Sequence, residues 1–180
     1  MATLPRLYID SCCFIDAVSY KIGMTLDRER LVDVSYTNGL LQAALDKKIE
    51  ILTSTLTIAE CLYAGDRNDP VSDEVKNLFR SILESGKIVF LINADYFVMQ
   101  RARDLRWTDG LQLGGADGIH VASAKEQKCT EFITVDGKIA ERNDPDAFKS
   151  FGVHVIRPSK TIHLPTNYEN MDLFAGDTPQ

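Results

Sequence analysis

Five short apolar runs, separated by longer segments with helical spacing, limit the folds that this chain can adopt. Short apolar runs are typical of buried strands, and strands that alternate with helices are typical of a mainly parallel sheet. The expected strands are Leu7–Ile9, Ile49–Thr53, Lys87–Ile92, Phe132–Val135 and Val153–Ile156. The sequence therefore predicts an α/β protein.

The segments between the runs carry apolar residues at helical intervals. Val75, Leu78, Phe79, Ile82 and Leu83 keep this spacing, and Gly86 is placed to end their helix before the third strand. The expected helices are Cys12–Tyr20, Glu29–Asp46, Thr57–Ala64, Ser72–Ser85, Tyr96–Arg106 and Ala116–Gln127. From Arg157 onward the residues are mostly polar, so we expect a loosely packed or frayed tail. Alternatively, its apolar residues dock on the body or on another subunit; these are Leu164, Tyr168, Met171, Leu173 and Phe174.

Length and composition narrow the class of protein. A chain of 180 residues with 44% hydrophobic and 26% charged residues fits one globular domain. The apolar runs are too short for a membrane span and the first residues do not resemble a signal peptide, so we expect a cytoplasmic protein. The four cysteines lack paired metal spacing, and we expect them to be reduced. A net charge of -6 argues against non-specific coating of nucleic acid, but it allows a local basic patch.

Four acidic residues stand where an apolar run ends or a helix begins. Asp10 and Asp136 close the first and fourth apolar runs, Glu60 lies within an apolar helical segment, and Asp117 opens the last expected helix. Because ligands of open parallel sheets gather at the carboxyl ends of the strands, all four can meet at one edge. A carboxylate among apolar neighbours is costly to bury unless a cation compensates it.

Carboxylates alone favour Mg²⁺ or Mn²⁺ over Zn²⁺ or Cu²⁺. Such a site suits phosphodiester hydrolysis, because the metal lowers the pKa of an attacking water and stabilises the leaving oxygen. Each acid also has a structural interpretation: Asp10 as a helix cap, Asp117 as a complement to the helix dipole, and Asp136 as a turn residue. Glu60 is the hardest of the four to explain structurally, because a buried unpaired glutamate is rare.

Further residues are candidates for substrate contacts. Ser11 can bind a phosphate or a water at the site, or cap the first helix. Asp16 either faces solvent or supports a metal from the outer shell, and His120, one turn after Asp117, either relays protons or packs in the core. The basic candidates for phosphate contacts are Arg101, Arg103, Arg106, Lys125, Lys128, Lys138 and Arg142, with Lys138 and Arg142 favoured because they follow Asp136. Trp107 either stacks a base or packs half-buried at a helix end.

These segments resemble the signature of the PIN domain, the nuclease fold of VapC-type toxins and related RNA-processing enzymes. The matching pieces, in the family's order, are Leu7–Asp10, Leu56–Glu60, Ala116–Ala124 and Ile133–Asp136. The resemblance implies a three-layer α/β/α fold with a five-stranded, mainly parallel sheet over residues 1–156. The polar residues 157–180 make this chain longer than the compact members of the family, and we expect them to form an extension. The resemblance also implies an Mg²⁺- or Mn²⁺-dependent endoribonuclease whose metal-binding and catalytic residues are Asp10, Glu60, Asp117 and Asp136.

The same resemblance implies partners. It suggests an RNA substrate, a small antitoxin protein that inserts near the acidic site, and a homodimer. Many members of the family carry an asparagine where this chain has Cys12, which motivates the alternative of a catalytically silent PIN module that binds RNA or serves as a scaffold. A phosphatase that uses Asp10 as phosphoryl acceptor is disfavoured, because that pattern requires a second aspartate at the position of Cys12.

Overall fold

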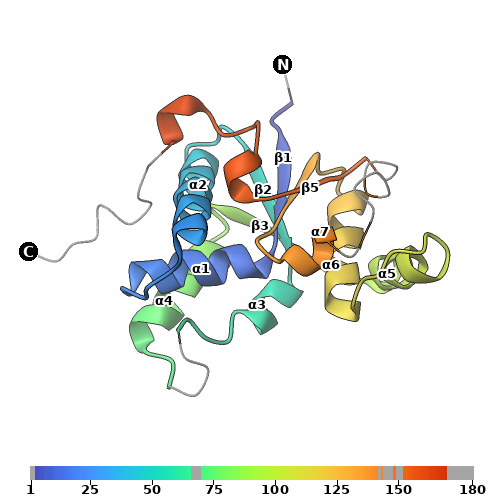
Figure 1. Ribbon diagram of the computed structural model, residues 1–180, viewed down its shortest axis with the longest axis horizontal. Helices are drawn as coiled ribbons and strands as arrows, with labels where there is room; N and C mark the ends of the chain where they lie inside the picture. The colour runs from blue at the N-terminus through green and yellow to red at the C-terminus, as the bar shows by residue number, and fades with distance from the viewer. Residues whose placement is uncertain (1–2, 66–69, 142, 144–147, 149–151, 170–180) are drawn as a thin grey trace, which may run out of the picture.

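The structure is a computed structural model that describes residues 3–65, 70–141, 143, 148 and 152–169. Within them, five strands form one all-parallel sheet in the order β3-β2-β1-β4-β5 (Figure 1). The strands are β1 (Arg6–Ile9), β2 (Glu50–Ser54), β3 (Val89–Ile92), β4 (Glu131–Ile133) and β5 (His154–Ile156). The predicted five-stranded α/β fold is confirmed.

The side chains of the central strand β1 show that the sheet is covered on both faces. Leu7, Tyr8 and Ile9 are all fully buried. Because successive side chains of a strand point to opposite faces, Leu7 and Ile9 belong to one apolar cluster and Tyr8 to the other. A strand that is buried on both faces has a continuous apolar sequence, and this run of apolar residues is what predicted β1.

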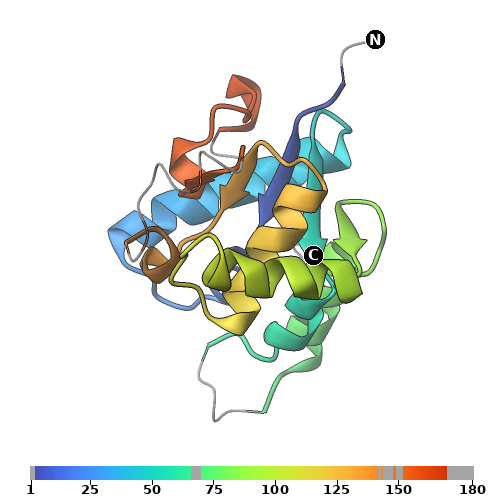
Figure 2. The ribbon, with the colours of Figure 1, turned by 90° about the vertical axis from the view of Figure 1, so that its right-hand side faces the viewer.

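Helices form a layer on each face of the sheet. One layer contains α1 (Ser11–Lys21), α2 (Arg28–Leu45) and α4 (Asp73–Leu83), and the other contains α5 (Tyr96–Trp107) and α6 (Gly115–Glu126). Figures 1 and 2 show the two layers on opposite sides of the strands, with α5 crossing α6. No helix in the described part of the chain combines the length and the apolar character that a membrane span requires.

Two short helices at the carboxyl edge of the sheet differ from the expectation. Helix α3 covers only Leu56–Glu60, whereas the sequence predicted a helix to Ala64, and α7 (Gly137–Glu141) was not predicted at all. Thr57 is the only buried residue of α3, so α3 lacks the apolar stripe that prolongs a helix. Glu60 therefore lies at the last position of a helix that ends at the edge of the sheet.

The described part of the polar tail is packed against α2 rather than frayed. It forms two short 3₁₀ turns, η1 (Pro158–Lys160) and η2 (Thr166–Tyr168), and buries Leu164 and Tyr168. Two buried acids hold it: Asp33 pairs with Arg157 at 2.6 Å, and Glu131 accepts a hydrogen bond from the Thr161 hydroxyl at 2.6 Å. For these residues the expectation of a loose tail is wrong and its alternative is confirmed, because Leu164 and Tyr168 dock on the body and the polar contacts add to this anchoring. Met171, Leu173 and Phe174 lie outside the described residues.

Candidate metal centre

Asp10 stands at the carboxyl end of β1, beside the end of β4. Its backbone N–H donates to the Ile133 carbonyl at 3.0 Å, which continues the pairing of the two strands. Its side chain accepts from the backbone N–H of Ser11 at 2.8 Å and caps α1, so the capping interpretation of Asp10 holds. A cap satisfies only part of a carboxylate, and it leaves room for a second role.

The Asp10 carboxylate is 5% exposed and is surrounded by uncharged donors. Besides the Ser11 amide, these are the Thr134 hydroxyl at 2.7 Å, the Cys12 thiol at 3.3 Å and the Ser11 hydroxyl at 3.4 Å. The ring nitrogen Nε2 of His120 is farther away, at 3.9 Å from Oδ1. Neutral donors orient a carboxylate but carry no full charge, so a cation at this site would compensate the buried charge.

Glu60 reaches the same place from the end of α3. Its Oε2 lies 2.7 Å from Nε2 of His120. Burial of Glu60 acts to raise its pKa, but the hydrogen bond and charge of His120, together with a hydrogen bond from Ser11, outweigh it and lower the pKa. Burial likewise acts to lower the pKa of His120, and the hydrogen bond to Glu60 with the negative charges of Asp10, Glu60 and Asp117 raises it.

His120 is held from both ring nitrogens. It is 1% exposed, and Nδ1 lies 2.8 Å from the Tyr8 hydroxyl. That hydroxyl also accepts the backbone N–H of Ser54 at 2.7 Å, and the Tyr8 ring stacks on Phe132 with centroids 5.3 Å apart. The packed-histidine interpretation is therefore correct, but the packing fixes His120 against Glu60.

Asp10, Glu60 and His120 form a compact set of potential metal ligands. One ligand atom from each lies within 4.8 Å of the others. Sequence reasoning ranked His120 only as a secondary candidate for substrate contacts. The feature of the sequence that points to His120 is its position one turn after Asp117, on the same helix face.

Asp117 and Asp136 lie at the same edge but outside that compact set. Asp117 is in the first turn of α6, where its Oδ2 accepts the Gly114 N–H at a long 3.4 Å, so its helix-capping role is also present. Burial raises the pKa of Asp117; the Gly114 hydrogen bond lowers it, and the negative charges of Asp10 and Asp136 raise it further. Asp136 begins a turn, accepting the Lys138 N–H at 2.8 Å. The charges of Asp10 and Asp136 thus act on Asp117, while Asp10 and Glu60 belong to the compact set with His120.

The remaining candidates fall in different places. Ser11 contacts Asp10, Lys138 is exposed on α7, and Arg142 lies outside the described residues. Asp16 does not face solvent: it is buried, and its carboxylate is paired with Arg30 at 2.9 Å. Trp107 is 73% exposed, so the expectation of half-buried packing is wrong.

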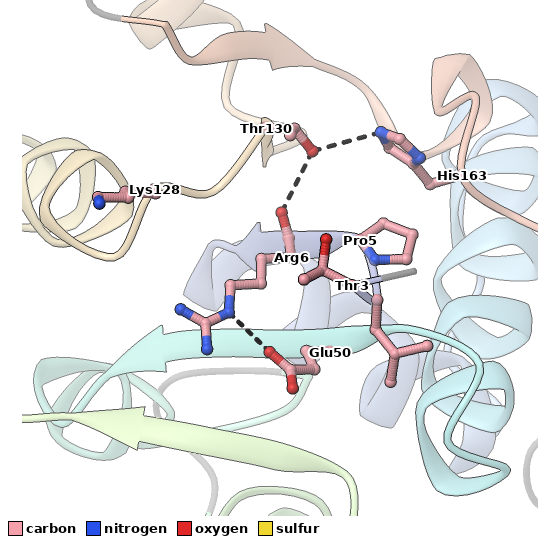
Figure 3. Close-up of a pocket in the computed structure, with 8 residues that line it drawn as sticks. Thr3, Pro5, Arg6, Glu50, Lys128, Thr130 and His163 are labelled. Atoms are coloured by element: carbon pink, nitrogen blue, oxygen red, sulfur yellow. Dashed lines mark hydrogen bonds and ion pairs between the residues drawn. The ribbon is translucent and has the colours of Figure 1, made fainter. Parts of the chain in front are cut away.

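A cleft of about 750 Å³ lies at the opposite edge of the sheet, away from the four acids (Figure 3). Its lining includes Arg6 and Glu50 at the amino ends of β1 and β2, which pair with each other at 2.7 Å. His163 lies 3.3 Å from the Thr130 hydroxyl. Ligands of parallel sheets gather at the carboxyl ends of the strands, where the four acids lie.

Comparison with known proteins identifies the family. The family model described as "PIN domain" matches residues 7–144. The chain belongs to the PIN-domain family. PIN domains are generally nucleases, and PIN nucleases generally use divalent metals. The acidic and histidine cluster described above is a possible metal-binding site of that kind.

Two solved structures are similar to this PIN domain. "Structure of FitAB bound to IR36 DNA fragment" aligns with 16% identity and a TM-score of 0.51, covering 86% of this chain and 96% of that one. "Crystal Structure of FitAcB from Neisseria gonorrhoeae" aligns with 18% identity and a TM-score of 0.46, covering 86% and 99%. At such identities the likeness concerns the fold alone. No curated protein sequence matches the chain.

Proposed function

We propose that this PIN domain is a metal-dependent endoribonuclease that holds Mg²⁺ or Mn²⁺ among Asp10, Glu60, Asp117 and Asp136. The observation that carries the proposal is the environment of Asp10. Asp10 is 5% exposed, its carboxylate accepts hydrogen bonds from uncharged donors alone among the described residues, and it shares a compact ligand set with Glu60 and His120. A buried carboxylate beside a second, half-buried one is costly without a cation.

The chemistry of the donor set fits the proposed ions. The four carboxylates supply oxygen ligands, which suit Mg²⁺ and Mn²⁺. The Thr134 hydroxyl and the Cys12 thiol both bind Oδ2 of Asp10 and orient it. Cys12, which stands where many PIN domains carry asparagine, thus still supplies a donor to the first aspartate. This contact supports a working site over the catalytically silent alternative.

The residues of the chain divide the remaining tasks. Asp10 is fixed by its neutral donors, and Glu60 is fixed by His120. The pKa of Asp117 is raised, so its carboxylate is more basic than that of an ordinary aspartate and is suited to accept a proton from the attacking water. A bound divalent ion would increase the acidity of that water and stabilise the charge that develops on the phosphate.

The proposal has a direct test with RNA and the full chain. We expect cleavage with Mg²⁺ or Mn²⁺ and none with EDTA. Asp10→Asn and Asp117→Asn should each lower the rate more than about 100-fold, the upper end of the loss typical of residues that only support a metal ligand. The matched control is Asp73→Asn, an exposed aspartate in the first turn of α4. Wild-type rates in both site variants, with circular dichroism unchanged, contradict the proposal.

We also propose that the enzyme is the toxin of a toxin–antitoxin pair. This proposal rests on the resemblance of its motifs to VapC-type toxins and on membership in the PIN family. A small antitoxin protein whose segment inserts near the acidic edge would block the nuclease. Expression of the chain alone should arrest growth, and expression of Asp10→Asn should not. Equal growth arrest by both proteins rejects a toxic nuclease.

A further inference from the structure

A groove runs between α5 and the first turn of α6, on the side of the sheet opposite α2. Its cavity volume is about 270 Å³. Helix α5 contributes Met99, Arg103, Arg106 and Trp107, and the start of α6 contributes Gly115 together with its N-cap, Gly114. This volume lies below the range of about 300 to 1,000 Å³ typical of pockets that enclose a whole small ligand. The groove therefore suits one part of a longer ligand.

Trp107 gives the groove an exposed aromatic surface. Trp107 is the only tryptophan of the chain, and it is 73% exposed. The guanidinium carbon of Arg103 lies 4.6 Å from the centroid of its ring. The guanidinium therefore lies over the ring, and a ring layered with a planar guanidinium forms a surface on which an unpaired base can stack.

The charge of the groove favours an anion. Arg103 and Arg106 line it, and no acidic side chain does so in the described part of the chain. Arg106 is oriented by a 3.2 Å hydrogen bond to the Leu113 carbonyl, which precedes the glycine pair. Arg103 pairs at 3.1 Å with Asp104, but both side chains are exposed, and such pairs contribute little and yield to a phosphate.

The groove leads to the acidic edge of the sheet. Gly114 lines the groove and donates its N–H to Asp117, so the end of the groove adjoins one of the four acids. At Gly115 even an added Cβ would meet no atom within 4 Å, so the space over the start of α6 is open. The end of the groove at Gly114 is therefore in contact with Asp117, one of the carboxylates of the acidic edge.

We infer that this groove binds a single-stranded segment of the RNA substrate beside the scissile phosphate, with a base stacked on Trp107 and phosphates held by Arg103 and Arg106. The inference rests on the proposed function for the identity of the strand. A duplex keeps its bases stacked on one another, so only unpaired nucleotides can use the surface of Trp107. The groove makes this enzyme selective for loops and single-stranded regions.

The single tryptophan provides a direct measurement. A short oligouridylate is added to the full chain in EDTA, where the proposed enzyme binds but does not cut, and Trp107 emission is recorded. We expect saturable quenching by the oligouridylate and much weaker quenching by a blunt RNA duplex. Binding of the oligouridylate, detected by anisotropy of a labelled strand, with unchanged Trp107 emission would overturn the inference, as would no binding at all.

Variants separate stacking from charge. Arg103→Ala and Arg106→Ala should each weaken binding and lower the slope of log affinity against log salt by about 0.7. Arg80→Ala on α4 is the matched control and should change neither quantity. Trp107→Ala should weaken binding by about tenfold, while Trp107→Phe keeps most of the affinity. Tyr96→Ala, an exposed aromatic at the other end of α5, controls for loss of a surface ring. Wild-type affinity in Trp107→Ala refutes stacking.

The failure of this inference differs from the failure of the proposed nuclease. If RNA is cut with Mg²⁺ while the groove variants keep the wild-type KM, the nuclease stands and the groove assignment is wrong. If the groove binds single strands as described but no divalent metal supports cutting, the groove assignment stands and the proposed nuclease is wrong. Quenching by an acidic peptide but not by the oligouridylate shows that the groove is a protein-binding surface and overturns the RNA assignment.

Discussion

At the scale of residues, a series of hydrogen bonds holds the Glu60 carboxylate in place although its helix, α3, has only five residues. The series runs from Ser54 through Tyr8 and His120 to Glu60. The Ser54 N–H donates to the Tyr8 hydroxyl, which contacts Nδ1 of His120, and Nε2 contacts Glu60. Residues that orient metal ligands in this way commonly affect metal affinity about 10- to 100-fold. The position of Glu60 therefore depends on His120 and, through it, on Tyr8.

Tyr8→Phe isolates one link of these hydrogen bonds, because phenylalanine keeps the ring that stacks on Phe132. If the centre binds Mn²⁺ as proposed, we expect this variant to bind it about tenfold more weakly or worse, measured by electron paramagnetic resonance of free Mn²⁺. Tyr168→Phe is the matched control, since it removes a hydroxyl that contacts Asp46 on another part of the molecule. Equal Mn²⁺ affinity in Tyr8→Phe and the wild type would show that Glu60 needs no support from Tyr8.

The Glu60–His120 contact also makes stability depend on pH. The raised pKa of His120 gives stability that is complete below its unfolded pKa, about 6.5, and is lost as the pH rises through the folded value. The lowered pKa of Glu60 gives stability that is complete above its unfolded pKa, about 4.3, and is lost as the pH falls through the folded value. The contact is therefore strongest between about pH 4.3 and 6.5.

We expect Glu60→Gln in EDTA to destabilise the protein more at pH 5.5 than at pH 9, by on the order of 1 kcal/mol. Urea unfolding of both proteins at the two pH values measures this difference. Ser72→Ala, which removes a cap on α4, should have the same effect at both pH values and serves as the reference. A Glu60→Gln effect that does not change with pH contradicts the assignment of charge to this contact.

The sequence indicated which acids matter but not how they are held. Strand ends follow from apolar runs, so the positions of Asp10 and Asp136 at the sheet edge were predictable. The contact between Glu60 and His120 was not, because it joins residues 60 positions apart through side-chain orientation alone. Likewise, nothing in the local sequence of Asp16 reveals that Arg30 takes up its charge.

At the scale of elements, the layers followed from apolar periodicity, and the errors concern short elements at the edges. Helix α4 shows an apolar stripe and was predicted within a few residues, since burial of that stripe determines its length. Helices α3 and α7 have only five residues each, too few for a periodic pattern. These two helices border the proposed site, so its outline was the least predictable part of the fold.

Gly39 on α2 is an element-scale test of packing against helix propensity. Alanine in a helix is favoured over glycine by about 1 kcal/mol. However, a Cβ at Gly39 would lie 2.4 Å from the backbone carbonyl oxygen of Tyr168, in the tail that packs on α2. Because backbone must shift, we expect Gly39→Ala to destabilise the protein by about 1 to 3 kcal/mol in urea unfolding.

The control is Gly115→Ala, where an added Cβ meets no atom within 4 Å. It should leave stability unchanged or increase it slightly. If Gly39→Ala stabilises the protein as Gly115→Ala does, the tail does not pack on α2 as the structure describes.

At the scale of the whole molecule, the tail and the sheet are joined through two buried acids from different elements. Asp33 on α2 binds Arg157 and the Ser159 N–H, and Glu131 at the start of β4 binds the Thr161 hydroxyl. The tail follows the last strand, so these contacts tie the end of the described chain to α2 and to β4. Its polar composition predicted looseness because composition does not reveal buried partners.

Arg157→Met tests this anchoring. Asp33 is 1% exposed, so the variant leaves a buried carboxylate with its amide partner but without its cation. The loss of a partner from a buried ion pair costs about 3 to 5 kcal/mol, and we expect about 2 to 3 kcal/mol here because the Arg157 side chain is 35% exposed and solvent weakens the pair. Unfolding in urea at neutral pH measures the change.

The double variant Asp33→Asn/Arg157→Met separates lost attraction from the cost of an uncompensated charge. An asparagine carries no charge to desolvate and its oxygen can still accept the Ser159 N–H, so the double variant should be more stable than Arg157→Met alone. Limited proteolysis of the tail should follow the same order, because local opening exposes it. If the double variant is less stable than Arg157→Met, the buried charge of Asp33 is compensated by another group, and Arg157 is not what holds the tail to α2.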